Sequence, residues 1–351
     1  MRQNNIFLML LKVFFFLSIL VATSAVRAEL KVVTTIKPLH SLIANVMDGV
    51  GEPALLIEGS TSPHSFTLKP SHAKLLEEAD IIFWVGESIE TFMERPLESI
   101  VKNAEVVEFM EVESINKLKF REESIFEDHD DHDNHDDHDD HDDHDDHDDN
   151  DDHDEHDDHD EHDDNDDHDE HDDHSGHDDH GHGHGEFDAH IWLDPMNAKE
   201  MVHEIAHELG DLDPANKNKY EANAQATIQA LDQLINDIEK GINKDAKFVV
   251  FHDAYQYFEE RFETRAAGAL TLNTDVLPGA KQIADIQDVI KDRGIKCIFS
   301  EPQFNPKIIT TIAEDMNIKT GVFDPLGANI YSNKDLYFKI IQYLGNDLKG
   351  C

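Results

Sequence analysis

Residues 30–46 read LKVVTTIKPLHSLIANV, a β-branched run followed directly by a helical stretch. Residues 30–36 have the composition of a buried strand, and Pro38 suits the first turn of a helix. The same alternation of strand and helix continues along the chain, which predicts α/β architecture with mostly parallel sheets flanked by helices. Further strands are predicted at 54–57, 81–85, 105–109, 248–251, 297–300 and 320–323. Helices are predicted at 39–46, 70–79, 89–101, 196–209, 254–261, 279–293, 306–317 and 334–344.

A long helix is predicted in the middle of this alternation. Asp213-Pro214 marks its start, apolar side chains recur at helical spacing, and Gly241 follows its end. At 1.5 Å per residue it would be about 40 Å long, enough to bridge two lobes and hold them nearly rigid. We therefore expect two α/β lobes with a cleft between them. The expected boundaries are 29–212 for the N-terminal lobe, 213–241 for the linking helix and 242–351 for the C-terminal lobe.

The first residues predict export. Arg2 and Lys12 lie before and at the start of an apolar run, residues 13–21, and Val26-Arg27-Ala28 suits signal-peptidase cleavage. The run is too short to span a membrane comfortably, and no cysteine follows the cleavage point to accept a lipid. Residues 1–28 are therefore expected to be a signal peptide, and the mature protein is expected in the periplasm.

Residues 128–184 contain almost only Asp, Glu, His, Asn and Gly. Without apolar side chains to bury, this insert in the N-terminal lobe cannot offset the entropy of ordering, so a disordered loop is predicted. It holds 18 of the 25 histidines, mostly at every third residue, and 32 of the 77 acidic residues. Imidazole and carboxylate groups both bind metals, so the insert is expected to hold many cations weakly rather than only to solvate the chain.

The charge of the chain excludes one class of partner. With 29 basic and 77 acidic residues the net charge is −48, and outside the insert acidic residues still outnumber basic ones by 45 to 29. Nucleic acid would be repelled by such a surface, whereas cations would be attracted. We therefore expect no nucleic-acid partner.

The two cysteines, Cys297 and Cys351, form an even pair in a chain predicted to be exported. In an oxidising compartment such a pair favours a disulfide over a metal site or a reactive thiol. A disulfide that closes the loop between the two cysteines would stabilise the fold by roughly 4 kcal/mol in the chain-entropy model. Two free thiols are the alternative.

Three histidines outside the insert lie at or near the ends of predicted strands: His64, His190 and His252. Ligands of open α/β sheets bind beyond the carboxyl ends of the strands, so two histidines from the first lobe and one from the second could meet in the cleft. A single histidine would more often be structural, but three at corresponding positions favour a metal site. Three imidazoles and one oxygen ligand complete a zinc tetrahedron.

Seven groups of short motifs stand out: IKPLHS at 36–41, SPH at 62–64 with LKPS at 68–71, AD at 79–80 with WVG at 84–86, HIWLDP at 190–195, FHDAY at 251–255, EPQF at 301–304 and DPLG at 324–327. Together they resemble those of the ZnuA-type zinc-specific solute-binding proteins of ABC importers, the metal-binding cluster A-I family. The resemblance covers the mature chain except the insert. It implies a periplasmic protein, not an enzyme, that captures Zn²⁺ and delivers it to an ABC-type membrane permease; we expect it to act as a monomer.

The resemblance assigns zinc binding to His64, His190 and His252. The related manganese-binding branch has a carboxylate where this chain has His252, so the imidazole set favours zinc. Charged, His-rich loops also occur in this family at the place of the insert, and Cys297 and Cys351 match a disulfide of some members.

The fourth ligand stays open. Some members have a glutamate directly before the first histidine, but here that position is Pro63. Asp324, at the end of a predicted strand, is the first choice, and water or His40 are the alternatives. Glu301 is interpreted as a supporting or structural residue.

Two other functions compete with this interpretation. His203-Glu204-Ile205-Ala206-His207 fits the H-E-x-x-H pattern of zinc peptidases, in which two histidines on one helical face bind the metal and the glutamate activates water. No third ligand is apparent downstream, and so short a motif also occurs by chance. A zinc storage or buffering protein without a transporter is the other alternative, because the sequence carries no recognisable signature of a permease-facing surface.

Overall fold

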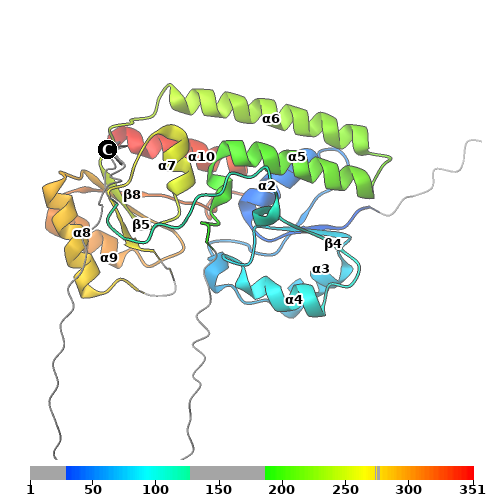
Figure 1. The fold of residues 1–351 in the computed structure, drawn as a ribbon, viewed down its shortest axis with the longest axis horizontal. Helices are drawn as coiled ribbons and strands as arrows, with labels where there is room; N and C mark the ends of the chain where they lie inside the picture. The colour runs from blue at the N-terminus through cyan, green and yellow to red at the C-terminus, as the bar shows by residue number, and fades with distance from the viewer. Residues whose placement is uncertain (1–28, 127–185, 273, 275–276) are drawn as a thin grey trace, which may run out of the picture. The chain divides into compact units, whose positions relative to one another are not determined.

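The computed structural model describes residues 29–126, 186–272, 274 and 277–351 (Figure 1). The predicted signal peptide and the predicted disordered insert both lie outside these residues. Within the described part of the chain, no helix is long and apolar enough to cross a membrane.

Two parallel four-stranded sheets form the framework, which confirms the predicted α/β fold. The first has the order β2-β1-β3-β4 and the second the order β6-β5-β7-β8, so both follow the same scheme. In each sheet the chain adds its second strand on one side of the first and its third strand on the other. The pairs β1/β3 and β5/β7 are therefore the places where ligands of such sheets bind, beyond the carboxyl ends of the strands. The strands are β1 (Val32–Thr34), β2 (Ala54–Leu55), β3 (Ile81–Trp84), β4 (Glu105–Glu108), β5 (Phe248–His252), β6 (Ala269–Thr271), β7 (Cys297–Ser300) and β8 (Lys319–Val322).

Helices cover both sheets, and their apolar sides form a continuous core that reaches from one sheet to the other. A smaller cluster fills the space between the second sheet and its outer helices. The helices are α2 (Lys37–Val46), α3 (Pro70–Glu78), α4 (Glu94–Ser99), α5 (Pro195–Leu212), α6 (Lys217–Glu239), α7 (Gln256–Phe262), α8 (Ala280–Asp292), α9 (Lys307–Met316) and α10 (Leu336–Asp347). Short 3₁₀ turns are η1 (Pro63–Ser65), η2 (Thr91–Met93), η3 (Phe109–Glu111), η4 (Ile191–Leu193) and η5 (Leu348–Gly350).

The long helix α6 begins at Lys217, later than predicted. The carboxylate of Asp213 accepts hydrogen bonds from the Asn216 side chain (2.6 Å) and the Tyr220 hydroxyl (3.2 Å), which closes a turn between α5 and α6. The helix has 23 residues and is about 34 Å long. It lies alongside α5 (Figure 1) and also packs on α2 and α10, which follow strands of the first and second sheets. Because the two sheets belong to one compact unit, the exact lobe boundaries remain predictions.

Strand β6 was not predicted, because only Thr271 of its three residues is β-branched, whereas the equally short β1 lies in a longer β-branched run. It is the edge of the second sheet, and the segment before the insert adds to that edge: Ile125 pairs antiparallel with Gly268, and Ser124 O accepts from Ala269 N (2.8 Å). A Cβ at Gly268 would lie 2.6 Å from Ser124 O, so this close approach requires glycine.

The predicted disulfide is formed between Cys297, the first residue of β7, and Cys351. It ties the end of the chain to the second sheet across 54 residues. A closed loop of that length restricts the unfolded chain by about 4 kcal/mol in the chain-entropy model.

Candidate metal centre

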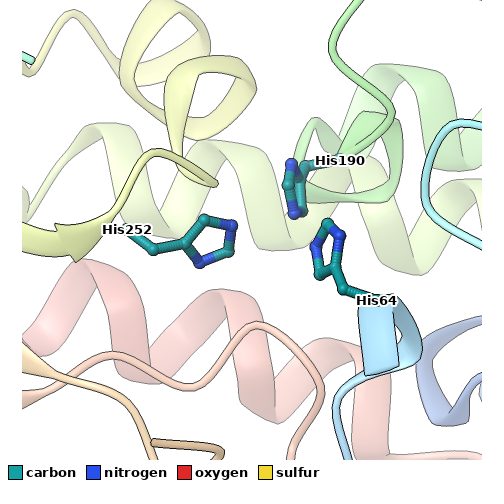
Figure 2. Close-up of side chains that lie close together, drawn as sticks. All are labelled: His64, His190 and His252. Carbon is teal, nitrogen blue, oxygen red and sulfur yellow. The ribbon is translucent and has the colours of Figure 1, made fainter. Parts of the chain in front are cut away.

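Three imidazoles face one another at the carboxyl ends of the two sheets (Figure 2). His64, His190 and His252 each offer one ring nitrogen, and these nitrogens lie within 4.8 Å of one another. Around a tetrahedral zinc ion with bonds of about 2.0–2.1 Å, ligand nitrogens are about 3.4 Å apart. Small side-chain rotations therefore suffice to bring all three onto one ion.

The three histidines come from different parts of the chain. His64 lies in η1, after β2, where Ser62 Oγ accepts a hydrogen bond from its backbone N–H (3.3 Å). His190 directly precedes η4, and His252 is the last residue of β5. The first sheet's half thus supplies two imidazoles and the second supplies one.

Glu301 orients His252. It follows β7, the neighbour of β5, and its two carboxylate oxygens lie 3.1 and 3.2 Å from His252 Nδ1. Because a carboxylate accepts, Nδ1 donates and the lone pair is left on Nε2. That Nε2 is buried and meets no hydrogen-bond partner among the described residues, as expected of an atom that awaits a metal ion.

Asp188 plays the same part for His190. Its Oδ1 accepts from both the ring Nδ1 (2.6 Å) and the backbone N–H (3.0 Å) of His190. The Asp188 carbonyl in turn accepts from the Tyr257 hydroxyl (2.6 Å), which itself accepts from Leu118 N (2.9 Å). Carboxylates that hold the far nitrogen of a ligating imidazole fix its tautomer and make it a better metal ligand.

Burial and charge shift the protonation of these groups. Burial raises the pKa of Asp188 to about 7 and that of Asp253 also to about 7. Burial lowers the pKa of His190 well below its usual value. For His252, burial is outweighed by the Glu301 carboxylate, so its pKa is raised. The centre therefore concentrates buried acidic groups around the imidazoles, and this arrangement favours a divalent cation.

The space at the centre is small. Together with Trp192, Phe304, Pro325 and Leu326, the three histidines line a cavity of about 10 Å³. A volume of that size holds no more than one particle as large as water. The centre thus suits a single ion and excludes an organic ligand.

Two other proposed ligands lie apart from this group. Asp324 Oδ2 accepts from Ala328 N (2.6 Å), and its Oδ1 accepts from Leu326 N (3.2 Å) and the Gln303 amide (3.1 Å). His40, on α2, has its Nε2 3.2 Å from Pro53 O, and burial lowers its pKa. The structure therefore brings three of the five candidate residues together.

The H-E-x-x-H segment lies on α5, away from the three histidines. His203 and His207 are exposed, and His207 Nδ1 is 3.0 Å from Glu208 Oε1 of the same helix. Neither belongs to a group of three metal-ligating side chains within the described residues.

The supporting role of Asp188 was not predicted, although its position two residues before His190 was a usable signal. Arg121 was also missed. It donates to Asp253 Oδ1 (2.8 Å) and Glu259 Oε2 (2.6 Å) and lies 4.0 Å from the Phe126 ring centre. Its guanidinium anchors the segment before the insert beside the residue that follows His252.

The protein has two parallel sheets that are flanked by helices and joined by a long helix, and an ion-sized centre lies at the ends of their strands. This arrangement is that of a solute-binding protein for metal ions. A family model described as "Zinc-uptake complex component A periplasmic" matches residues 32–351. The chain belongs to this family, the ZnuA proteins. Because the family is the binding component of a zinc transporter, this membership argues against the peptidase alternative.

The sequences of known ZnuA proteins match this chain over most of their length. The high-affinity zinc uptake system protein ZnuA of Brucella abortus (strain 2308) is 47% identical over 322 residues, 91% of each chain. The protein of the same name from Yersinia pestis is 31% identical over 336 residues, 95% of each chain.

Solved structures share the fold. A crystal structure of ZnuA superposes with a TM-score of 0.65 at 20% identity and covers 90% of this chain and 98% of that one. A zinc-bound ZnuA deletion mutant that lacks 138–173 of its own sequence gives 0.63 at 19% identity, over 91% and 96% of the two chains.

Proposed function

We propose that this protein is the periplasmic binding component of an ABC-type zinc importer, which captures Zn²⁺ and delivers it to the membrane permease. Family membership supports the role in uptake. The observation that carries the choice of cargo is the set of three converging imidazoles, because neutral imidazole suits zinc and disfavours the harder ions Mg²⁺, Ca²⁺ and Mn²⁺.

Capture follows from the preorganised ring nitrogens. Glu301 and Asp188 hold the Nδ1 atoms of His252 and His190, so that both rings present Nε2 to the ion and need only small rotations to bind it. Binding of the cation favours ionised Asp188, whose pKa of about 7 leaves it partly protonated before zinc arrives. Zinc uptake should therefore release protons, and affinity should fall as the pH is lowered.

For the fourth ligand we retain Asp324 as the first proposal, with water or His40 as alternatives. Asp324 could reach the ion only by giving up hydrogen bonds to the loop that follows it. Water needs no such change.

The insert is proposed to gather zinc near the centre without building the tight site, and the protein is proposed to act as a monomer. A flexible tract must be ordered around each ion it binds, so its ions should be held weakly and exchange quickly.

The decisive experiment has two arms. Zinc binding by the purified mature chain is measured against a competing chelator, and zinc uptake is measured in vesicles that contain the cognate permease, with and without the protein. One tight zinc per chain together with uptake that depends on the protein is the expected result. Tight binding without any effect on uptake would favour the storage alternative.

A further inference from the structure

Lys37, at the start of α2, is a buried ammonium whose bonds cross from the first half of the protein to the second. Its side chain donates to three backbone carbonyls, those of Gly327, Ala328 (3.2 Å) and Ile330 (2.7 Å). An ammonium has three N–H donors, so its donor capacity is filled by this one loop. Lys37 is 5% exposed, and burial lowers its pKa against the opposing effect of Asp324.

The loop that Lys37 holds, residues 324–330, forms one wall of the metal centre. Pro325 and Leu326 line the cavity beside the three histidines. A second bond from the first half reaches the same wall, because Trp192 Nε1 donates to Pro325 O (2.9 Å). Gly327 has a φ of +65°, so the loop also has a backbone shape that few residues other than glycine adopt.

An ion that leaves past Pro325 and Leu326 must displace them, because the cavity that they line together with the histidines is only about 10 Å³. The two halves meet at this wall, where Lys37 uses all three of its N–H donors to bond the loop carbonyls. Hydrogen bonds from a charged group contribute more than neutral ones, so their breakage is a substantial barrier.

From these contacts we infer that Lys37 is a positioning residue that fastens the 324–330 loop over the histidines and thereby sets the rate at which zinc leaves. The inference rests on the proposed function, because it takes zinc as the cargo of the centre. Lys37 binds no metal in this scheme; it acts through the loop alone.

A matched control exists in the same region. Lys334 also joins the two halves, through an ion pair with Asp48 (2.7 Å), but both side chains are about half exposed. An exposed pair of this kind contributes little, so Lys334→Met removes an inter-lobe lysine without loosening the cavity wall.

The test measures zinc dissociation from the full mature chain by stopped-flow mixing with an excess of chelator. Lys37→Met keeps the length of the side chain but removes its donors and charge. Dissociation should become at least about tenfold faster, the effect of losing roughly one charge-assisted hydrogen bond. Hydrogen exchange should accelerate in residues 326–330, and Lys334→Met should match the wild type in both measurements.

Several results would overturn the inference. A folded Lys37→Met protein with unchanged dissociation would show that zinc leaves by another route, such as the neighbouring cavity of about 20 Å³ that Ser88 and Leu272 line. Equal acceleration in the Lys334→Met protein would indicate general loosening.

If Lys37→Met does not fold, Lys37→Gln carries the test, because it removes the charge but keeps N–H donors; unchanged dissociation in that folded variant would refute the inference. Failure of the wild type to bind zinc would instead refute the proposed function.

Discussion

Replacing Glu301 by Gln tests whether the carboxylate behind His252 contributes to zinc binding. Glutamine has nearly the same shape and can still accept a hydrogen bond from Nδ1, so the change removes the charge and leaves the ring in place. Glu301 and His252 are each 3% exposed, and water therefore screens their interaction poorly. The two contacts between the Glu301 carboxylate and His252 Nδ1, at 3.1 and 3.2 Å, should be replaced by a single hydrogen bond from Nδ1 to a neutral amide oxygen.

The expected loss is 10- to 100-fold in zinc affinity, which corresponds to about 1.4–2.7 kcal/mol. One effect opposes it. The carboxylate also raises the pKa of His252, so its removal lessens competition from protons. Since zinc carries two positive charges and the proton one, the loss of zinc affinity should dominate, and it should be smaller at pH 6 than at pH 8.

The assay is zinc titration in competition with a chelator of known affinity, at both pH values. Glu204→Gln is the control, because Glu204 lies on α5 outside the centre and its replacement should leave the affinity unchanged. If Glu301→Gln binds zinc within twofold of the wild type at both pH values, Glu301 only fills space and the electrostatic reasoning fails.

The remaining predictions concern the ligands, the pH response and the insert. His252→Ala should weaken zinc binding at least about 100-fold and His203→Ala should not, since only the former removes a converging nitrogen; the reverse order in the same titration would restore the peptidase hypothesis. In chelator, the melting temperature should fall as the pH rises from 6 to 8, because Asp188 and Asp253 have folded pKa values of about 7, above their ordinary range, and the pKa of His252 is also raised. The lowered pKa values of His190 and His40 act in the opposite direction, but the folded chain still binds more protons than the unfolded one in this balance. Calorimetry checks this, and a melting temperature that rises over this interval would contradict it. Deleting residues 128–184 should lower the number of zinc ions bound and slow capture at scarce zinc, while the tight affinity changes little. A large loss of that affinity would mean that the insert supplies a ligand.

The sequence predicted most of the fold because its strands are strongly β-branched or aromatic. Residues 248–251 and 297–300 were predicted as strands almost at their observed ends. The short edge strand β6 gave no such signal, since its pairing depends on Ser124 and Ile125, which lie far away in the sequence. The start of α6 was placed too early, because Pro214 suits both the first turn of a helix and the tight turn that the Asp213 side chain closes.

The metal centre was predictable to the extent that residue type and position after a strand decide it. His252 ends β5 and His64 follows β2, as expected, whereas no named strand among the described residues comes directly before His190, which precedes η4; the structure nevertheless gathers all three. Asp324 also follows a strand, yet its two oxygens serve the backbone of the following loop. No pattern in the sequence distinguishes a carboxylate that faces the cavity from one that folds its own loop, because the difference lies in the direction of one side chain.

The division of the imidazoles between the two halves has a mechanical consequence. A zinc ion held by His64 and His190 on one side and by His252 on the other would link the two halves of the protein directly. Zinc–nitrogen bonds are short, about 2.0–2.1 Å, and they weaken steeply when stretched. A displacement of the halves by about 1 Å, less than the length of one such bond, would cost the ion a ligand. A partner that separated the two halves would therefore need to move them only a short distance to release the zinc ion.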